Sequence, residues 1–548
     1  MHRAKVDMRA LAKFLLVALS LTFAVVDARE TFTEEVLVER LKDDAVAFVF
    51  RFVQKSPISA RHRAIASKTL SSISSESGFE ELELWFGRGR WNARRWGAPP
   101  VTAKPIGAEV WATWAKNKTR DADASQVDPS LGGWKKAVKS LGGVFCASLS
   151  TLAESSALTQ PVLAFQEWDG AKTARARVDA DVVVKHASLP HESVCVENLA
   201  PWLKQLPCRD RSGIGKVLAT AHAVFGARHL TFGLRLSKTN TEIISEQTLM
   251  MVVPTGDRAY GDIMESIAHS RNDACPAADD SYVHVRDGER LKTLGALKGR
   301  DQLEAMTRGV NHRKPIVYVE RFLTGNGNEN GGIIIDVERT EGDLSEPIRI
   351  RLFQPLPWFV KLFMHTLRIQ HDGRDVSRDA TEGIKFMPAI DRIRSSTLEL
   401  QAVIPANVST LRLYMQYDKG FLRQSEFPPD ANRGFDLPPA KMDAFMIRPM
   451  AEVISEAKQT PLTLSLGKAA GPTETVYMNG LLMLLPTPDF SMTFNVSALT
   501  GSLVSVLAIT IIRKLIERVA WKDYKPGKSS ESRKASLLKH AFSRLLRK

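Results

Sequence analysis

The chain has 548 residues, of which 44% are hydrophobic and 25% charged, a composition typical of a folded protein with several domains. Its formal net charge of +14 is concentrated at the ends: residues 513–548 hold twelve Lys and Arg against three acidic residues, and residues 1–28 hold four against two. The body between them is nearly neutral. This distribution argues against a nucleic-acid partner and agrees with a membrane topology.

Residues 1–28 are predicted to be a secretory signal peptide, because a basic stretch precedes a short apolar run from Phe14 to Val26 and the small residues of Val26-Asp27-Ala28. The alternative is a retained signal anchor, although the apolar run is short for a membrane span. A signal peptide places the body in the lumen of the secretory pathway, where cysteines form disulfides. The basic residues are Arg3, Lys5, Arg9 and Lys13.

Residues 29–310 are expected to form an N-terminal luminal domain of α/β type. Leu37, Leu41, Ala45 and Phe48 recur at helical spacing, whereas Leu82 to Phe86 alternate as in a strand. Helix is also expected from Trp134 to Leu152, and an irregular segment from Leu189 to Cys208, which is dense in Pro, Cys and Trp. A packed β-rich core is indicated by Trp91, Trp96, Trp111 and Trp114.

Residues 311–492 are expected to form a second luminal domain, an antiparallel β-sandwich, because alternating segments recur between turn signals. The glycine-rich run from Gly325 to Gly331 joins two of these segments, so we interpret it as a hairpin loop rather than a phosphate-binding loop. The predicted strands are Thr231–Leu236 in the first domain and Ile316–Leu323, Gly332–Val337, Ile348–Phe353, Leu398–Ile404, Thr410–Gln416 and Leu481–Leu485 in the second.

A single transmembrane helix is predicted over residues 493–512, since no charged residue occurs from Phe494 to Ile512. Residues 513–548 then form a basic cytoplasmic tail, as the positive-inside bias requires. Within the span, Ser497, Gly501 and Ser505 recur every four residues. Small residues at this spacing allow close helix packing, so we expect this face to contact partner helices rather than lipid alone.

Catalytic and metal-binding signatures are missing from the sequence, including the metalloprotease, serine-hydrolase and P-loop motifs. His191 and Cys195 are four residues apart, but on a proline-flanked loop that makes a poor nucleophile and base pair. We therefore expect no catalytic residues, no metal and no cofactor, and a binding or scaffolding role. Of the glycosylation sequons, Asn117 and Asn407 are candidates, whereas Asn495 lies at the mouth of the span.

Four cysteines are present, Cys146, Cys195, Cys208 and Cys275, and the sequence leaves their pairing open. Several distinctive segments resemble the PIG-T family, component T of the GPI transamidase of the endoplasmic reticulum. Together they cover most of residues 80–510. The segments are Leu82 to Pro100 with its Trp-x4-Trp-Gly, Gly107–Trp111, Phe145–Leu149, Leu189 to Cys208, Pro355–Trp358, Pro429–Phe435 and Leu485–Met492.

The resemblance implies a non-catalytic subunit of a complex that attaches GPI anchors to proteins, together with other membrane subunits and the GPI lipid. It implies that Cys195 forms a disulfide with the caspase-like catalytic subunit, PIG-K. Three cysteines then remain, for which we expect an intrachain disulfide between Cys208 and Cys275 and a free Cys146 in its apolar run.

The resemblance also implies GPI-binding residues at Asn432, Asp489, Ser491 and Asn495, where amides and a carboxylate suit sugar hydroxyls and an ammonium group. The alternative, if the family is ignored, is that Asp489 and Ser491 only cap the membrane helix. Two other hypotheses stay open: a type I cell-surface adhesion or receptor glycoprotein, and a membrane-bound luminal hydrolase with an unrecognised site.

Overall fold

The structure is a computed structural model, in which the chain divides into two compact units, Met1–Pro486 and Thr487–Lys548. It describes residues 29–58, 65, 67–115, 129–162, 182–270, 273–288, 290–295, 299–307, 312–325, 329–340, 346–376, 381–427, 433–446, 459–460, 462–463, 473–486 and 490–522. The predicted signal peptide and most of the predicted tail lie outside these residues.

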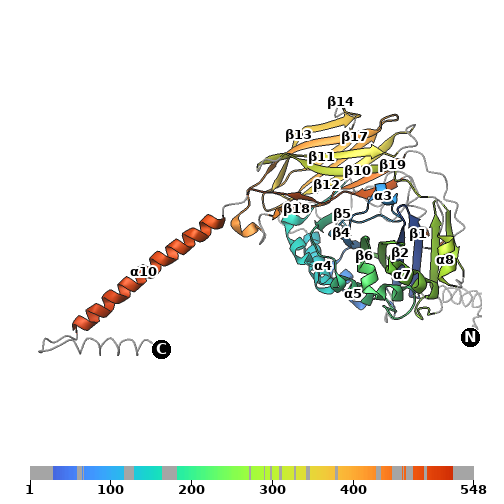
Figure 1. Cartoon of the computed structure of the whole chain (residues 1–548), viewed down its shortest axis with the longest axis horizontal. Helices are drawn as coiled ribbons and strands as arrows, with labels where there is room; N and C mark the ends of the chain where they lie inside the picture. The colour runs from blue at the N-terminus through green and yellow to red at the C-terminus, as the bar shows by residue number, and fades with distance from the viewer. Residues whose placement is uncertain are drawn as a thin grey trace, which may run out of the picture. The chain divides into compact units, whose positions relative to one another are not determined.

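The first part of the body is built on a nine-stranded sheet of order β5-β4-β3-β6-β7-β2-β1-β8-β9 (Figure 1). Neighbouring strands run antiparallel except for β1 and β8, which are parallel. The strands are β1 (Thr31–Leu41), β2 (Ala45–Pro57), β3 (Glu81–Arg88), β4 (Gly107–Ala115), β5 (Val182–Leu189), β6 (His229–Lys238), β7 (Glu242–Pro254), β8 (Asp280–Asp287) and β9 (Arg290–Leu294).

The helix expected near residues 37–48 is wrong, because this segment is the β1–β2 hairpin. Leu41 pairs with Ala45, and the turn between them holds Asp43 and Asp44 at positive φ, a conformation that Asp adopts more readily than most residues. Both strands are buried on both faces, so their sequence is nearly continuously apolar instead of alternating. In such a continuous apolar sequence some hydrophobic residues, here Leu37, Leu41, Ala45 and Phe48, fall at helical spacing by chance.

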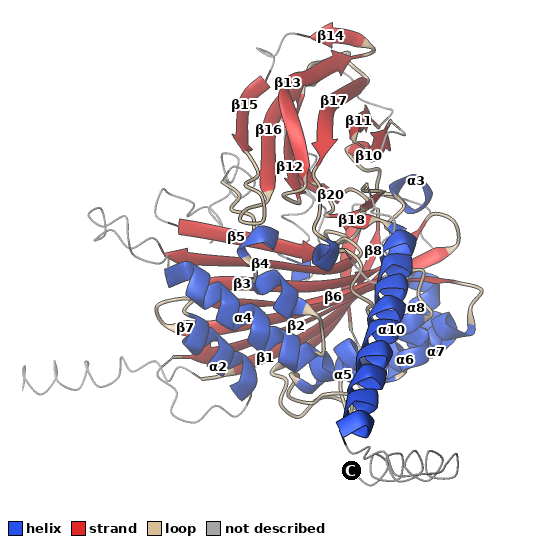
Figure 2. Ribbon diagram, turned by 90° about the vertical axis from the view of Figure 1, so that its left-hand side faces the viewer, coloured by secondary structure: helices blue, strands red, loops and turns tan. Residues whose placement is uncertain are grey.

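Helices α2 and α4 lie over one face of this sheet (Figure 2). Trp134 of α4 is fully buried in the main core, which also contains Phe86 and Phe232 of the sheet. The tryptophan-rich core is confirmed for Trp96 and Trp111, which are buried. The helices of this part are α2 (Lys68–Ser77), α3 (Ala93–Trp96), α4 (Pro129–Phe145), α5 (Val196–Lys204), α6 (Ala221–Phe225), α7 (Arg258–His269) and α8 (Arg300–Met306), with 3-10 turns at Leu149–Ala153, Ser155–Ala157 and Ile214–Ala219.

The irregular segment expected from Leu189 to Cys208 is also wrong, because it contains helix α5. Pro201 lies inside this helix, where it removes one backbone hydrogen bond. Leu199 and Trp202 are buried in the core. Tertiary packing of this apolar face therefore outweighs the local cost of the proline.

The second part of the body is the predicted β-sandwich, made of two five-stranded antiparallel sheets around a separate apolar core. A small ribbon of two strands, β18 (Phe435–Leu437) and β21 (Leu481–Met483), accompanies them. One sheet contains β10 (Val317–Thr324), β11 (Asn330–Arg339), β17 (Thr410–Lys419), β13 (Val360–His371) and β14 (Arg374–Val376). The other contains β15 (Thr381–Met387), β16 (Ser396–Ile404), β12 (Ile348–Leu356), β19 (Lys441–Met446) and β20 (Thr473–Tyr477).

The glycine-rich run from Gly325 to Gly331 joins β10 to β11, so the hairpin interpretation is confirmed. All described strands up to Leu294 belong to the first sheet, and all from Val317 onward belong to the sandwich or the ribbon. The predicted domain boundaries at residues 310 and 492 stay predictions.

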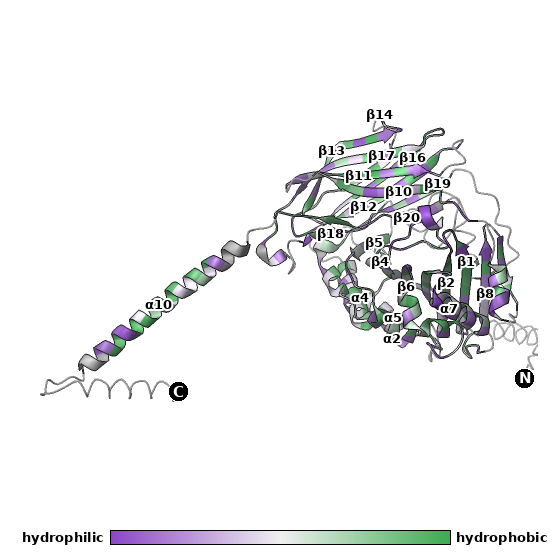
Figure 3. Cartoon of the chain, viewed as in Figure 1, coloured by the Kyte–Doolittle hydropathy of each residue, from purple (hydrophilic) through white to green (hydrophobic). Residues whose placement is uncertain are grey.

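The second unit contains α10 (Phe490–Lys522), a single unbroken helix. Residues Asn495–Arg518 have a mean hydropathy of 1.9 and are long and apolar enough to cross a membrane. Figure 3 shows hydrophobic residues along most of this helix and hydrophilic ones towards its C-terminal end. The chain is therefore a β-rich body with one candidate membrane span among the described residues.

Candidate functional site

Cys195 is the N-cap residue of helix α5. Its backbone N–H donates to Oδ1 of Asn198 at 2.9 Å, and its Sγ lies 3.5 Å from the same oxygen. The Asn198 side chain is buried, and its Nδ2 donates to the carbonyl oxygens of Phe145 at 2.9 Å and Cys146 at 3.3 Å. One asparagine therefore ties the Cys195 backbone to the end of α4.

The later residues of α5 are also hydrogen-bonded to the first sheet. The indole Nε1 of Trp202 donates to the carbonyl of Gly233 in β6 at 2.9 Å. Gln247 of β7 donates in turn to the carbonyl of Trp202 at 2.8 Å. The Cys195 thiol itself is partly exposed. The structure thus places an accessible thiol on a helix end that is anchored to the sheet.

The other cysteines have different surroundings. Cys208 and Cys275 form a disulfide with a Cα–Cα distance of 5.8 Å. Cys275 is buried, and the backbone N–H of Gly213 donates to the carbonyl of Asp273 at 2.6 Å beside it. Cys146 is a free thiol that is exposed rather than buried in its apolar run, because the chain turns there with a positive φ after α4 ends.

The predicted lipid-binding residues fall largely at the limits of the described structure. Asn432 and Asp489 lie outside the described residues, and Ser491 belongs to α10 without a described side chain. Asn495 is exposed on α10. Of the glycosylation candidates, Asn117 lies outside the described residues, whereas Asn407 is exposed in the turn between β16 and β17.

The segments that flank Asn432 and Asp489 come together in the β18–β21 ribbon. Phe435, three residues after Asn432, pairs with Met483, six residues before Asp489. The strands are antiparallel, so both segments leave the same end of the ribbon. At that end Gly434 has a φ of 90°, and a Cβ there would lie 2.6 Å from the carbonyl oxygen of Met483.

The opposite end of the ribbon is fastened by a buried arginine, Arg321 of β10. Its Nη2 donates to the carbonyls of Pro438, directly after β18, at 2.9 Å and of Asn479, shortly before β21. Its Nη1 donates to Oε1 of Gln354 at 3.0 Å. Burial lowers the pKa of Arg321 to about 9. Sequence reasoning missed both Arg321 and Asn198, because neither belongs to a recognised motif.

Two serine hydroxyls on or beside the small-residue face of α10 bond within the helix. Oγ of Ser505 donates to the carbonyl of Gly501 at 2.8 Å, and Oγ of the neighbouring Ser502 donates to that of Ala498 at 2.8 Å. At Gly501, an added Cβ would meet nothing within 4 Å. This face can therefore accept a neighbouring backbone closely, although the Ser505 hydroxyl already has a partner.

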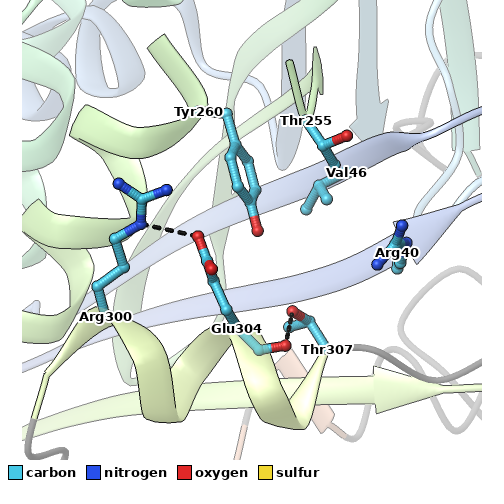
Figure 4. Close-up of a pocket in the computed structure, with 7 residues that line it drawn as sticks. All are labelled: Arg40, Val46, Thr255, Tyr260, Arg300, Glu304 and Thr307. Carbon is cyan, nitrogen blue, oxygen red and sulfur yellow. Dashed lines mark hydrogen bonds and ion pairs between the residues drawn. The ribbon is translucent and has the colours of Figure 1, made fainter. Parts of the chain in front are cut away.

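A polar cavity of about 250 Å³ opens beside α7 and α8 (Figure 4). Nε of Arg300 donates to Oε1 of Glu304 at 2.7 Å, and burial raises the pKa of Tyr260 above its ordinary value. None of the lining residues is a cysteine, serine or histidine. The lining is Arg40, Val46, Thr255, Tyr260, Arg300, Glu304 and Thr307.

His186 and Glu109 form a buried pair, with Nε2 of His186 3.2 Å from Oε1 of Glu109 and both side chains 2% exposed. Burial lowers the pKa of His186. For Glu109 burial alone would raise the pKa, but the hydrogen bond to His186 and the charge of Lys104 bring it below its ordinary value. The imidazole packs against Trp111 and against Phe353 of β12, so this pair joins the first sheet to the sandwich.

Metal ligands are likewise not assembled: among the described residues, no group of three or more His, Cys, Asp or Glu could hold a metal ion. The described residues do present an anchored Cys195 thiol, the β18–β21 ribbon and one candidate membrane span.

Comparison with known proteins decides the family. The family model described as "Gpi16 subunit, GPI transamidase component" matches residues 15–280 and 292–542. The chain belongs to the Gpi16 family. It is therefore a GPI transamidase subunit, and the PIG-T resemblance is confirmed.

Several characterised relatives of this Gpi16-family chain align along most of its length. The human GPI-anchor transamidase component PIGT is 28% identical, with 87% of this chain and 89% of the relative covered. The PIG-T homologue of Schizosaccharomyces pombe is 26% identical over 98% of this chain and 97% of its own length. The GPI16 component of Saccharomyces cerevisiae is 25% identical, with coverages of 84% and 82%.

Proposed function

We propose that this chain is the non-catalytic subunit of a GPI transamidase that holds the caspase-like catalytic subunit, PIG-K, through a disulfide at Cys195 and contributes contacts to the GPI lipid. Other membrane subunits complete the complex, and the small-residue face of α10 packs against their helices. No nucleic acid and no cofactor take part.

The anchored thiol carries this proposal. A disulfide between two chains needs a thiol that is accessible to the partner. It is also favoured by a backbone whose position is fixed by other contacts. Cys195 is partly exposed, and Asn198 fixes its backbone to the carbonyls at the end of α4. The remaining pair, Cys208 and Cys275, is already closed within the chain.

The test is a non-reducing gel of the complex after mild detergent extraction. The wild-type chain should run as a heavier covalent species that reducing agent dissolves. Cys195→Ser should abolish that species, and the matched control Cys146→Ser, which removes the other free thiol, should preserve it. Persistence of the heavier species in Cys195→Ser would refute the linkage, and its loss in the control would reassign it.

The lipid contacts are proposed for Asn432, Asp489, Ser491 and Asn495. The β18–β21 ribbon supports this grouping because the segments carrying Asn432 and Asp489 leave the same end of it. At about 3.5 Å per residue, the connecting chain limits the distance from that end to roughly 10 Å for Asn432 and roughly 20 Å for Asp489. A carboxylate at headgroup height suits an ammonium, and amides suit sugar hydroxyls.

Attachment of a GPI-anchored reporter tests these residues in cells. Asp489→Asn and Asn432→Ala should lower attachment while the complex co-purifies in its normal amount. The control Asn330→Ala changes an exposed asparagine at the start of β11 and should leave attachment unchanged. Loss of the complex in the first two variants would make these residues structural instead.

For the topology we propose a type I protein of the endoplasmic reticulum membrane. Residues 1–28 are a cleaved signal peptide, residues 29–492 form the luminal domains, and residues 513–548 are cytoplasmic. Asn117 and Asn407 then carry glycans, in agreement with the exposure of Asn407. Protease added to sealed microsomes should remove only the tail. Digestion of the body from outside would reverse the orientation.

A further inference from the structure

Five large apolar side chains are exposed at one end of the sandwich, and we call this set the apolar rim. They come from the segment between β15 and β16, from the loop after β17 and from the β18–β21 ribbon. A surface that faces water rarely gathers so many. The rim consists of Ile390 (43% exposed), Ile393 (60%), Phe421 (70%), Leu482 (50%) and Leu484 (58%).

Arg392 joins the first two of these segments. Its Nη2 donates to the carbonyl of Phe421 at 3.3 Å, and its guanidinium forms an ion pair with Glu426. The same guanidinium lies 4.7 Å from the centre of the Trp358 ring. The loop with Ile390 and Ile393 is therefore fixed next to the loop with Phe421.

The second loop is joined to the ribbon by aromatic packing. The backbone N–H of Gly420 donates to the carbonyl of Phe359 at 2.6 Å, and the Phe359 ring lies 5.1 Å from that of Phe435. Phe435 pairs with Met483 in the ribbon. The three segments thus lie next to one another in the fold.

The ribbon itself shows which face is unusual. Met483 and Leu485 are buried, whereas Leu482 and Leu484 alternate with them and are exposed. The outer face of such a strand ordinarily carries polar residues when it meets water. Leucine at both outward positions indicates an apolar environment.

The membrane is the apolar environment nearest along the chain. Leu484 precedes Phe490, the first residue of α10, by six residues, and the candidate span begins at Asn495. With about 3.5 Å for each extended residue and 1.5 Å for each helical one, Leu484 lies within roughly 30 Å of Asn495. The connecting chain therefore cannot hold Leu484 farther than this from the start of the candidate span.

We propose that the apolar rim inserts into the interfacial layer of the bilayer that α10 crosses, so that the body contacts the membrane surface directly. Phe421 and the two leucines enter the boundary between headgroups and acyl chains. Arg392 and the exposed Arg423 lie at headgroup height, where a guanidinium can bond lipid phosphates. The contact is with bulk lipid and does not depend on the proposed function.

The experiment uses the full chain in phospholipid nanodiscs, with Cys146 and Cys195 replaced by serine. Phe421→Cys and Leu484→Cys are labelled separately with an environment-sensitive fluorophore. The control is Met306→Cys in α8, an apolar residue 37% exposed on a helix far from β18 in Figure 1. Lipids that carry a quencher in the acyl chain should quench the first two labels strongly and the third hardly at all.

Two outcomes would overturn the proposal. Quenching of the labels at 421 and 484 by aqueous iodide, as strong as at 306, would place the rim in water. Labels protected from both quenchers would show that protein, and not lipid, covers the rim. Because both substituted side chains are exposed, the substitutions leave the core packing intact.

Discussion

The side-chain amide of Asn198 makes hydrogen bonds both to Cys195 and to the end of α4. Oδ1 accepts from the Cys195 N–H at 2.9 Å, while Nδ2 donates to the Phe145 carbonyl at 2.9 Å. The amide is buried, so neither bond can be replaced by water. The position of the proposed linking thiol therefore depends on a residue that does not itself react.

Asn198→Ala should destabilise the body by about 2 kcal/mol, because it removes the helix cap and leaves the Phe145 carbonyl unpaired. It should also slow formation of the Cys195 disulfide. Asn198→Asp keeps an acceptor for Cys195 but sets a buried carboxylate oxygen against the carbonyls of Phe145 and Cys146, so it should destabilise the body at least as much as alanine. Denaturant unfolding and the yield of the covalent species measure the two effects. Equal disulfide yield in all three proteins would show that the thiol needs no support.

Gly434→Ala should disturb the β18–β21 ribbon, since a Cβ at a φ of 90° would lie 2.6 Å from the Met483 carbonyl oxygen. We expect a cost of about 1–3 kcal/mol and reduced GPI attachment. The Cys195 disulfide should form normally, because it lies in the other part of the body. Gly373→Ala has a φ of 78° and open space around it, so it controls for backbone strain alone.

Arg321→Leu should have the same functional signature as Gly434→Ala by a different route. It removes the donors to the carbonyls of Pro438 and Asn479 while filling part of the space with apolar atoms. GPI attachment should fall and the Cys195 linkage persist. Normal GPI attachment in Arg321→Leu would show that the contacts of Arg321 with the ribbon are not needed for lipid binding.

His229 should make the body less stable as the pH is lowered from about 6.5 to 4. Burial lowers the pKa of His229 to about 4, so the unfolded chain binds a proton in this range that the folded chain does not. The loss approaches about 3 kcal/mol for this one group. Burial raises the pKa of Glu35 and of Glu474 to about 7, which acts in the opposite direction, so the test compares two proteins. His229→Gln cannot titrate, so its unfolding free energy relative to that of the wild-type chain should rise as the pH falls. A difference that does not depend on pH would show that His229 makes no contribution.

Gly501→Leu should weaken the association of α10 with other membrane subunits. The helix itself has room for the side chain, so only a neighbouring helix is displaced. A loss of about 1 kcal/mol is expected for such a contact. Leu503→Phe adds bulk on the opposite face and serves as the control. Co-purification of the complex is the measurement. Equal recovery of both variants would show that this face contacts lipid and not a partner helix.

Local sequence patterns predicted the sandwich and two strands of the first sheet, β3 and β6, but not β1 and β2. Strands such as β17 alternate buried and exposed residues, and that period is visible in sequence. Strands β1 and β2 are covered on both faces, so their residues carry no alternation. The hairpin turn at Asp43 and Asp44 was the available signal, but the acidic residues fitted an amphipathic helix equally well.

The candidate site was predictable only where its chemistry is local. Cys195 is identified by the segment around it, whereas its partner Asn198 acts through carbonyls about fifty residues earlier in the chain. Arg321 acts on carbonyls more than a hundred residues later. Contacts of this kind arise from the packing of distant elements, which no window of sequence contains.

The continuity of α10 has a mechanical consequence. Its 33 residues make a rod of about 50 Å, longer than the hydrocarbon layer, and no break separates Gly501 from Arg513. A helix without a hinge rotates about its axis as one body. A partner helix that packs against the small-residue face inside the bilayer therefore also fixes the direction in which Arg513 and Lys514 point beyond it.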